Sequence, residues 1–249
     1  MEANISLKQK QKIESARQRS VNLRGRRLET NVKQILNTVL NNKHIKAFDV
    51  GRIRKFARID SSFKELAEYI KLPIESPCSQ RTIYLPDKDI FVFCEHDSEV
   101  RGGIKRYPLC VVSCQISFHA RGTEPLFWSV LTKNKVKYVL VTEDSDRYTE
   151  KPKTELGTCI KGNKIRSLFE CFLEKVYIIK KYDKVNNGIV KDINDFRHIF
   201  EEAPNARGFE FLVFDDYKRK PHAGYCGKIR PFDDLLFDIV KWKTQISGS

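Results

Sequence analysis

The chain has 249 residues, of which 41% are hydrophobic and 31% are charged, and its formal net charge is +14. A chain of this length can bury a sizeable core without disulfide or metal staples, and it has no apolar run of the roughly 18 residues that a membrane span needs. The charged N-terminal region lacks the apolar core of a signal peptide, so we expect a cytoplasmic protein with no membrane partner.

The positive charge is unevenly distributed. Before Glu29 there are eight basic residues against two acidic ones. Such an excess fits a polyanionic partner, either nucleic acid or an anionic membrane. A solvated helix face gives the same pattern, so charge alone suggests DNA or RNA without establishing it.

The usual metal and nucleotide motifs are missing. The seven cysteines form no CxxC pair, and the five histidines show no HExxH spacing. We therefore expect reduced, mostly buried thiols rather than a zinc site or disulfides. Because the P-loop and GxGxxG patterns are also absent, we expect no nucleotide cofactor.

The first predicted elements are helices. The region from about Ser6 to Leu40 is expected to be helical because its later part carries an apolar stripe at i, i+3, i+4 and i+7 spacing. Gly25 is expected to mark a break between a basic first segment and this packed one. A second short helix is predicted from Ser62 to Ile70.

Strand signals dominate the rest of the chain. We predict strands at 81–85, 90–94, 109–112, 136–142, 176–179 and 209–214, a turn at 86–88, and helices at 123–131, 164–173 and 232–242. Strands that alternate with helices indicate an α/β protein whose sheet is covered by helices.

Polar residues gather at the ends of two predicted buried strands. Asp89 comes just before the apolar run 90–94, and the later run ends in Ser113-Cys114-Gln115. Because side chains alternate along a strand, Ser113 and Gln115 share one face. If the two strands pair as a hairpin, Asp89 lies near that face.

These residues resemble the type II restriction endonucleases of the PD-(D/E)XK nuclease superfamily. In that family an aspartate begins one strand, and the next strand ends in a pattern similar to V-I-S-C-K-T-S-L-R-E-R. The resemblance lies within residues 86–128, and the matching residues are Asp89, Ser113, Cys114, Ser117 and Arg121. Gln115 stands in the place of the family's lysine, and His119-Ala120 in the place of its Arg-Glu. The run ending at Glu29 resembles the family's first helix, which often supplies a carboxylate.

The resemblance implies a single nuclease domain with a central mixed β-sheet flanked by helices. It implies an N-terminal helical part (about 1–72), a catalytic core (about 73–182) and a C-terminal recognition or dimerisation part (about 183–249). It also implies Mg²⁺-dependent cleavage of double-stranded DNA at a specific site by a homodimer, as in a restriction-modification system.

Phosphodiester hydrolysis of this kind needs a divalent metal, and Mg²⁺ is usually held by one or two carboxylates. Asp89 is the first choice of ligand, and Asp87 is the alternative because it completes the literal Pro-Asp pair. Glu124 and Glu29 are both candidates for the second carboxylate. Glu124 equally fits a capping box with Thr123, and Glu29 equally fits an exposed helix acid.

Gln115 is either a working catalytic residue or an inactivating replacement of the lysine. The residues expected to contact DNA are Ser117, His119, Arg121, Lys218, Arg219 and Lys220. The alternative functions are a catalytically inactive DNA-binding protein on the same fold, a DNA repair or single-strand nuclease, and a basic RNA-binding module. The buried strand start at Asp89 argues against the last.

Overall fold

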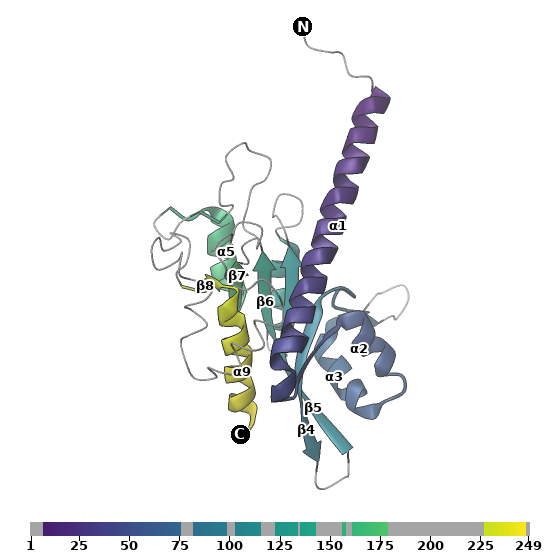
Figure 1. Ribbon diagram of the computed structural model, residues 1–249, viewed down its shortest axis with the longest axis vertical. Helices are drawn as coiled ribbons and strands as arrows, with labels where there is room; N and C mark the ends of the chain where they lie inside the picture. Colours follow the sequence, from purple (N-terminus) through teal and green to yellow (C-terminus); the bar gives the residue numbers. More distant parts are fainter. Residues whose placement is uncertain are drawn as a thin grey trace.

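The computed structural model describes residues 7–75, 82–98, 103–115, 123–133, 135–142, 156–157, 161–178 and 227–247. A six-stranded sheet lies at the centre, and helices pack against it (Figure 1). The sheet contains both parallel and antiparallel pairs, so the predicted α/β fold with a mixed central sheet is confirmed. Within these ranges, none of the helices is both long and apolar enough to cross a membrane.

The strands of the central sheet follow the order β1-β4-β5-β6-β7-β8. The first three pair antiparallel, and β5, β6, β7 and β8 run parallel to one another. These strands are β1 (Ile45–Asp49), β4 (Ile90–Ser98), β5 (Gly103–Gln115), β6 (Lys137–Thr142), β7 (Lys175–Ile178) and β8 (Ile229–Pro231). A separate pair joins β2 (Lys71–Glu75) to β3 (Thr82–Tyr84).

The β4–β5 hairpin determines where the site residues lie. Ile90 pairs with Val112, so Asp89, just before β4, adjoins Ser113 near the end of β5. Both strands continue past their apolar runs to the pair Ser98 and Gly103, which the sequence did not predict. The run Ile90–Cys94 is fully buried because helices cover both faces of this part of the sheet.

One face of the sheet is covered by α1 (Leu7–Leu40) and α9 (Asp233–Ser247). The predicted apolar stripe of α1 is buried against this face; it comprises Leu28, Val32, Ile35, Leu36, Val39 and Leu40. The helix is continuous through Gly25, so the predicted break there is wrong. Its N-terminal half extends beyond the sheet (Figure 1). A 3₁₀ turn, η1 (Asn41–Lys43), then leads into β1.

The opposite face is covered by α2 (Val50–Phe56), α3 (Ser61–Ile70), α4 (Glu124–Thr132) and α5 (Lys164–Phe172). The rings of Phe48, Phe56, Phe63 and Phe93 form one aromatic cluster under α2 and α3, with centroids 5.0–6.1 Å apart. The side chain of Asp60 caps α3 by accepting a hydrogen bond from the Ser62 amide.

Most of the predicted elements are confirmed to within a few residues. The predicted helices correspond to α1, α3, α4, α5 and α9, and the predicted strands to β3, β4, β5, β6 and β7. The elements that were not predicted are η1, β1, α2, β2 and β8. The strand predicted at 209–214 lies outside the described residues.

The described cysteines are free thiols, as expected. Cys94 and Cys110 are buried, Cys114 is partly buried, and Cys171 is exposed. Burial raises the pKa of the Cys94, Cys110 and Cys114 thiols, which keeps them protonated and unreactive. Cys78, Cys159 and Cys226 lie outside the described residues.

Candidate active site

Asp89 is held by its backbone at the point where β4 begins. Its amide donates to the carbonyl of Pro86 at 3.0 Å, closing the predicted turn. Its own carbonyl accepts a hydrogen bond of 2.8 Å from the amide of Val50, the first residue of α2. The position of Asp89 is therefore fixed from both sides, by the turn and by the start of a helix.

The carboxyl group of Asp89 is almost completely buried, since the residue is 7% exposed. The Tyr138 hydroxyl donates a hydrogen bond of 2.6 Å to Oδ2, and Ser113 also hydrogen-bonds to the side chain. Burial raises the pKa of Asp89 to about 7 although both hydrogen bonds lower it. At neutral pH this carboxyl group is therefore close to its midpoint of ionisation.

Glu29 and Glu124 approach Asp89 from the two faces of the sheet. Glu29 lies on α1, and Glu124 is the first residue of α4. The negative charges of both raise the pKa of Asp89, Glu124 more than Glu29. The three carboxylates that the sequence singled out are therefore close enough for the charges of Glu29 and Glu124 to act on Asp89.

The environment of Glu29 is mixed. Partial burial raises the pKa of its carboxyl group, and the charge of Asp49 raises it further, whereas the charge of Lys88 lowers it. Glu29 is therefore a partly buried acid among charges, not a solvated one. The capping-box alternative for Glu124 finds no support, because the Thr123 side chain makes no capping hydrogen bond to α4.

Asp87 does not lie beside Asp89, because residues 87 and 88 form a turn and the alternation of a strand does not apply to them. Its side chain is 64% exposed and forms an ion pair of 2.5 Å with Arg54. Of the two aspartates proposed from the sequence, Asp89 is the one grouped with the glutamates.

Gln115 is the last residue of β5, on the same face as Ser113. Its Oε1 atom is buried, and within the described part of the chain it accepts no hydrogen bond. A buried acceptor without a donor is costly, so we expect a partner for this oxygen beyond the described residues: another part of the chain, a water molecule, a cation or a substrate group. Cys114 points to the opposite face, where the charges of Glu29 and Asp89 help to raise the pKa of its thiol.

The donor set fits Mg²⁺. This ion prefers oxygen ligands and is usually bound by one or two carboxylates, with water completing the shell. Asp89, Glu124 and Glu29 supply carboxylate oxygens, and the unpaired Oε1 of Gln115 adds a neutral one. No group of three His, Cys, Asp or Glu side chains in the described ranges is close enough to enclose a metal by itself.

The residues expected to contact DNA lie outside the described residues, and the structure gives no account of them: they are Ser117, His119, Arg121, Lys218, Arg219 and Lys220. Sequence reasoning also missed two residues near the carboxylates. Tyr138 binds Asp89 directly, and Asp49 lies near Glu29 while pairing with Lys33 at 2.7 Å. A tyrosine within the apolar run 138–142 was the available signal for Tyr138, since a buried hydroxyl needs a partner.

The mixed sheet covered by helices, with Asp89 where β4 begins and Gln115 where β5 ends, defines an α/β protein. Residues 60–202 match the family model described as "BsaWI restriction endonuclease type 2". The match spans more than half of the 249 residues, and the chain belongs to this family. The resemblance to type II restriction endonucleases inferred from the sequence is thereby confirmed.

Among solved structures, the chain is similar to one titled "Crystal structure of specific restriction endonuclease AgeI-DNA complex". The sequence identity is 14% and the TM-score is 0.40. The similarity covers 60% of this chain and 51% of that chain, so this chain matches about half the length of that protein. No curated protein matches the sequence.

Proposed function

We propose that the protein is a type II restriction endonuclease that hydrolyses double-stranded DNA at a specific sequence with Mg²⁺. The observation that carries this proposal is the buried carboxyl group of Asp89 at the start of β4, on which the charges of Glu29 and Glu124 both act. Burying one carboxylate near two others is costly for a protein without a cation to bind there. Membership of a restriction endonuclease family supports the same reaction.

Asp89, together with Glu124 or Glu29, would hold the metal. When bound, Mg²⁺ supplies a Lewis acid for the phosphate and lowers the pKa of a water molecule. Tyr138 and Ser113 hold the Asp89 carboxyl group in one orientation and favour its ionised form. The catalytic role of Gln115 is to orient a water molecule or a phosphate oxygen through its side-chain amide, which both donates and accepts hydrogen bonds.

A homodimer acting on a palindromic site suits this function, because two-fold protein symmetry matches the symmetry of such a site. The chain is proposed to form one nuclease domain. Its C-terminal part from about residue 183 serves recognition or dimerisation, and its basic residues 218–220 contact DNA together with Ser117, His119 and Arg121.

The test is cleavage of a large DNA that contains many sequences, with Mg²⁺ or with a chelator. Wild-type protein should give discrete fragments with Mg²⁺ only. Asp89→Ala should give none but should still bind DNA. Asp97→Ala is the matched control, because Asp97 is an exposed aspartate in the outer part of the same hairpin, and it should cut normally. Equal cutting by wild type and Asp89→Ala would contradict the proposed site.

The second candidate is a DNA-binding protein that has lost cleavage, and the observation in its favour is Gln115 in the place of the family's lysine. In that case wild type binds DNA without cutting it, and Gln115→Lys restores cutting. Failure of both proteins to cut any DNA, with binding intact, would favour a pure binding function.

A further inference from the structure

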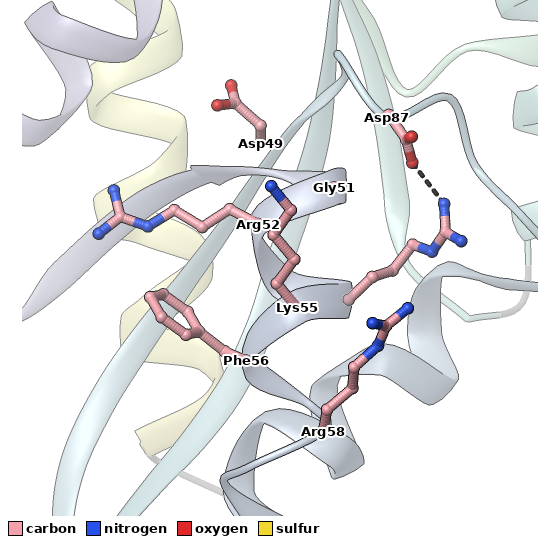
Figure 2. A pocket seen from close by; sticks show the side chains of 8 residues that line it. Asp49, Gly51, Arg52, Lys55, Phe56, Arg58 and Asp87 are labelled. Carbon is pink, nitrogen blue, oxygen red and sulfur yellow. Dashed lines mark hydrogen bonds and ion pairs between the residues drawn. The ribbon is translucent and has the colours of Figure 1, made fainter.

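A basic pocket lies beside the carboxylates, on the outer side of α2. Its volume is about 680 Å³, and it is lined by α2, the following turn and Asp87 (Figure 2). Four cationic side chains line it, Arg52, Arg54, Lys55 and Arg58, against two carboxylates. We call it the α2 pocket.

The two carboxylates of the pocket are already engaged. Asp49 pairs with Lys33 at 2.7 Å, and Asp87 pairs with Arg54 at 2.5 Å. The Arg54 guanidinium also lies 4.7 Å from the centre of the Tyr84 ring, which fixes its place. Arg54 is therefore part of the wall and is not available to a ligand.

The other three cations are exposed and form no ion pair with the described part of the chain. Arg52 stacks on the Phe48 and Phe56 rings at 4.3 and 5.2 Å. Figure 2 shows Lys55 directed toward the end of α2 near Asp49 and Asp87, whereas Arg58 lies at the other end of the helix. Lys55 and Arg58 thus carry positive charge that no acidic residue of the described chain neutralises.

The pocket and the carboxylates share a wall. The Gly51 amide donates to the carbonyl of Asp87 at 3.0 Å, one residue after the Val50 amide binds the carbonyl of Asp89. A Cβ atom at Gly51 would lie 3.3 Å from Cβ of Asp87, so the helix presses closely on the turn. Asp49 completes the link, because it lines the pocket and its charge acts on Glu29.

An open pocket with exposed cations selects negative charge rather than the identity of a base. Reading a base requires fixed donors and acceptors against its edge, whereas phosphates are held by mobile lysine and arginine side chains. A DNA strand whose scissile phosphate lies at the carboxylates must pass its neighbouring phosphates over adjoining surface. The α2 pocket is the adjoining surface whose charge is suited to them.

We propose that the α2 pocket binds two backbone phosphates of the DNA strand next to the phosphate at the carboxylates, one in contact with Lys55 and the other in contact with Arg58. This inference rests on the proposed function, because it takes duplex DNA to be the substrate. Contacts of this kind position the strand and contribute affinity for every sequence equally.

The test uses a double variant, Lys55→Gln with Arg58→Gln, in the full chain. Its matched control is Lys133→Gln with Lys164→Gln, which removes the same charge from exposed positions at the end of α4 and the start of α5. Affinity for a fluorescent duplex of mixed sequence is measured by anisotropy in chelator over a range of salt concentrations. Thermal unfolding midpoints check that all three proteins are folded.

Each phosphate contact contributes about 0.9 to the slope of log K against log salt. The double variant should therefore have a slope shallower than that of wild type by about 1.8, and the control an unchanged one. If the double variant has the same slope as wild type, or if the control variant loses as much slope as the double variant, the pocket proposal is wrong and the nuclease proposal is unaffected. Wild type that binds duplex DNA but never cuts it would overturn the nuclease and leave the pocket. If wild type does not bind duplex DNA, both the pocket proposal and the nuclease proposal are wrong. If millimolar inorganic phosphate displaces the duplex from wild type but not from the double variant, the pocket is a site for free phosphate instead.

Discussion

Asp89→Asn should make the metal-free protein more stable at alkaline pH. The carboxyl group is buried, and its pKa is raised from its ordinary value of 3.8 to about 7. A folded state that favours the protonated acid is most stable below the ordinary pKa and loses stability as the pH rises through about 7. Asparagine has nearly the same shape and stays neutral, so the variant should not lose this stability.

The size of the effect follows from the pKa difference. The change from 3.8 to about 7 corresponds to about 4 kcal/mol at pH 8.5 and to about 2 kcal/mol at pH 5, where the unfolded acid is already ionised. The stability of Asp89→Asn relative to wild type should therefore improve by about 2 kcal/mol between the two pH values. The altered hydrogen bonding to Tyr138 and Ser113 costs the same free energy at both pH values, so it cancels from the difference between them.

The assay is urea unfolding in chelator at pH 5 and pH 8.5 for wild type, Asp89→Asn and the control Asp97→Asn. Asp97 is exposed in the outer hairpin, and its replacement should have the same effect at both pH values. If the difference in stability between Asp89→Asn and wild type is as independent of pH as that of Asp97→Asn, Asp89 does not titrate near neutrality and burial does not raise its pKa.

The other predictions concern neighbouring groups. Tyr138→Phe removes a hydrogen bond that lowers the pKa of Asp89, so the variant should lose stability at a higher pH than wild type does. A loss of stability at a lower pH would contradict the assigned hydrogen bond. Gln115→Ala should slow cleavage by about 10²–10³-fold if its amide is catalytic, and an unchanged rate in a plasmid time course would exclude that role. Leu36→Ala should lower the free energy of unfolding in urea by about 2–5 kcal/mol, because Leu36 is 1% exposed on the face of α1 that packs against the sheet. A change near zero would mean that α1 does not pack on the sheet. Wild-type affinity for duplex DNA should fall steeply with salt, and a flat dependence would argue against DNA as the partner.

The sequence predicted the elements that have a strong pattern. The stripe of α1 and the runs of β4 and β6 were recognisable because helical and strand periodicities differ. The segment Ile45–Phe56 was missed because β1 passes directly into α2 without a turn residue, so the two patterns merge. The outer hairpin was missed because its strands are polar and were read as a connection.

The candidate site was predictable where neighbours in space follow from one hairpin. Alternation along β4 and β5 was enough to bring Asp89 close to Ser113. Tyr138 could not be found this way, because it reaches Asp89 from β6, a parallel neighbour of β5 that the sequence does not identify. The charges around Glu29 likewise depend on how α1 crosses the sheet.

The positions of the three carboxylates in the chain also determine when the proposed site can first assemble. Glu29, Asp89 and Glu124 come from α1, a turn and α4, which are far apart in the sequence and meet only through the sheet between them. During synthesis, all three carboxylates are present once the chain extends through Glu124, and Asp89 gains its hydrogen-bond donor once the chain extends through Tyr138. Because contacts between distant segments form late in folding, a growing or partly folded chain has the acidic residues but no assembled centre.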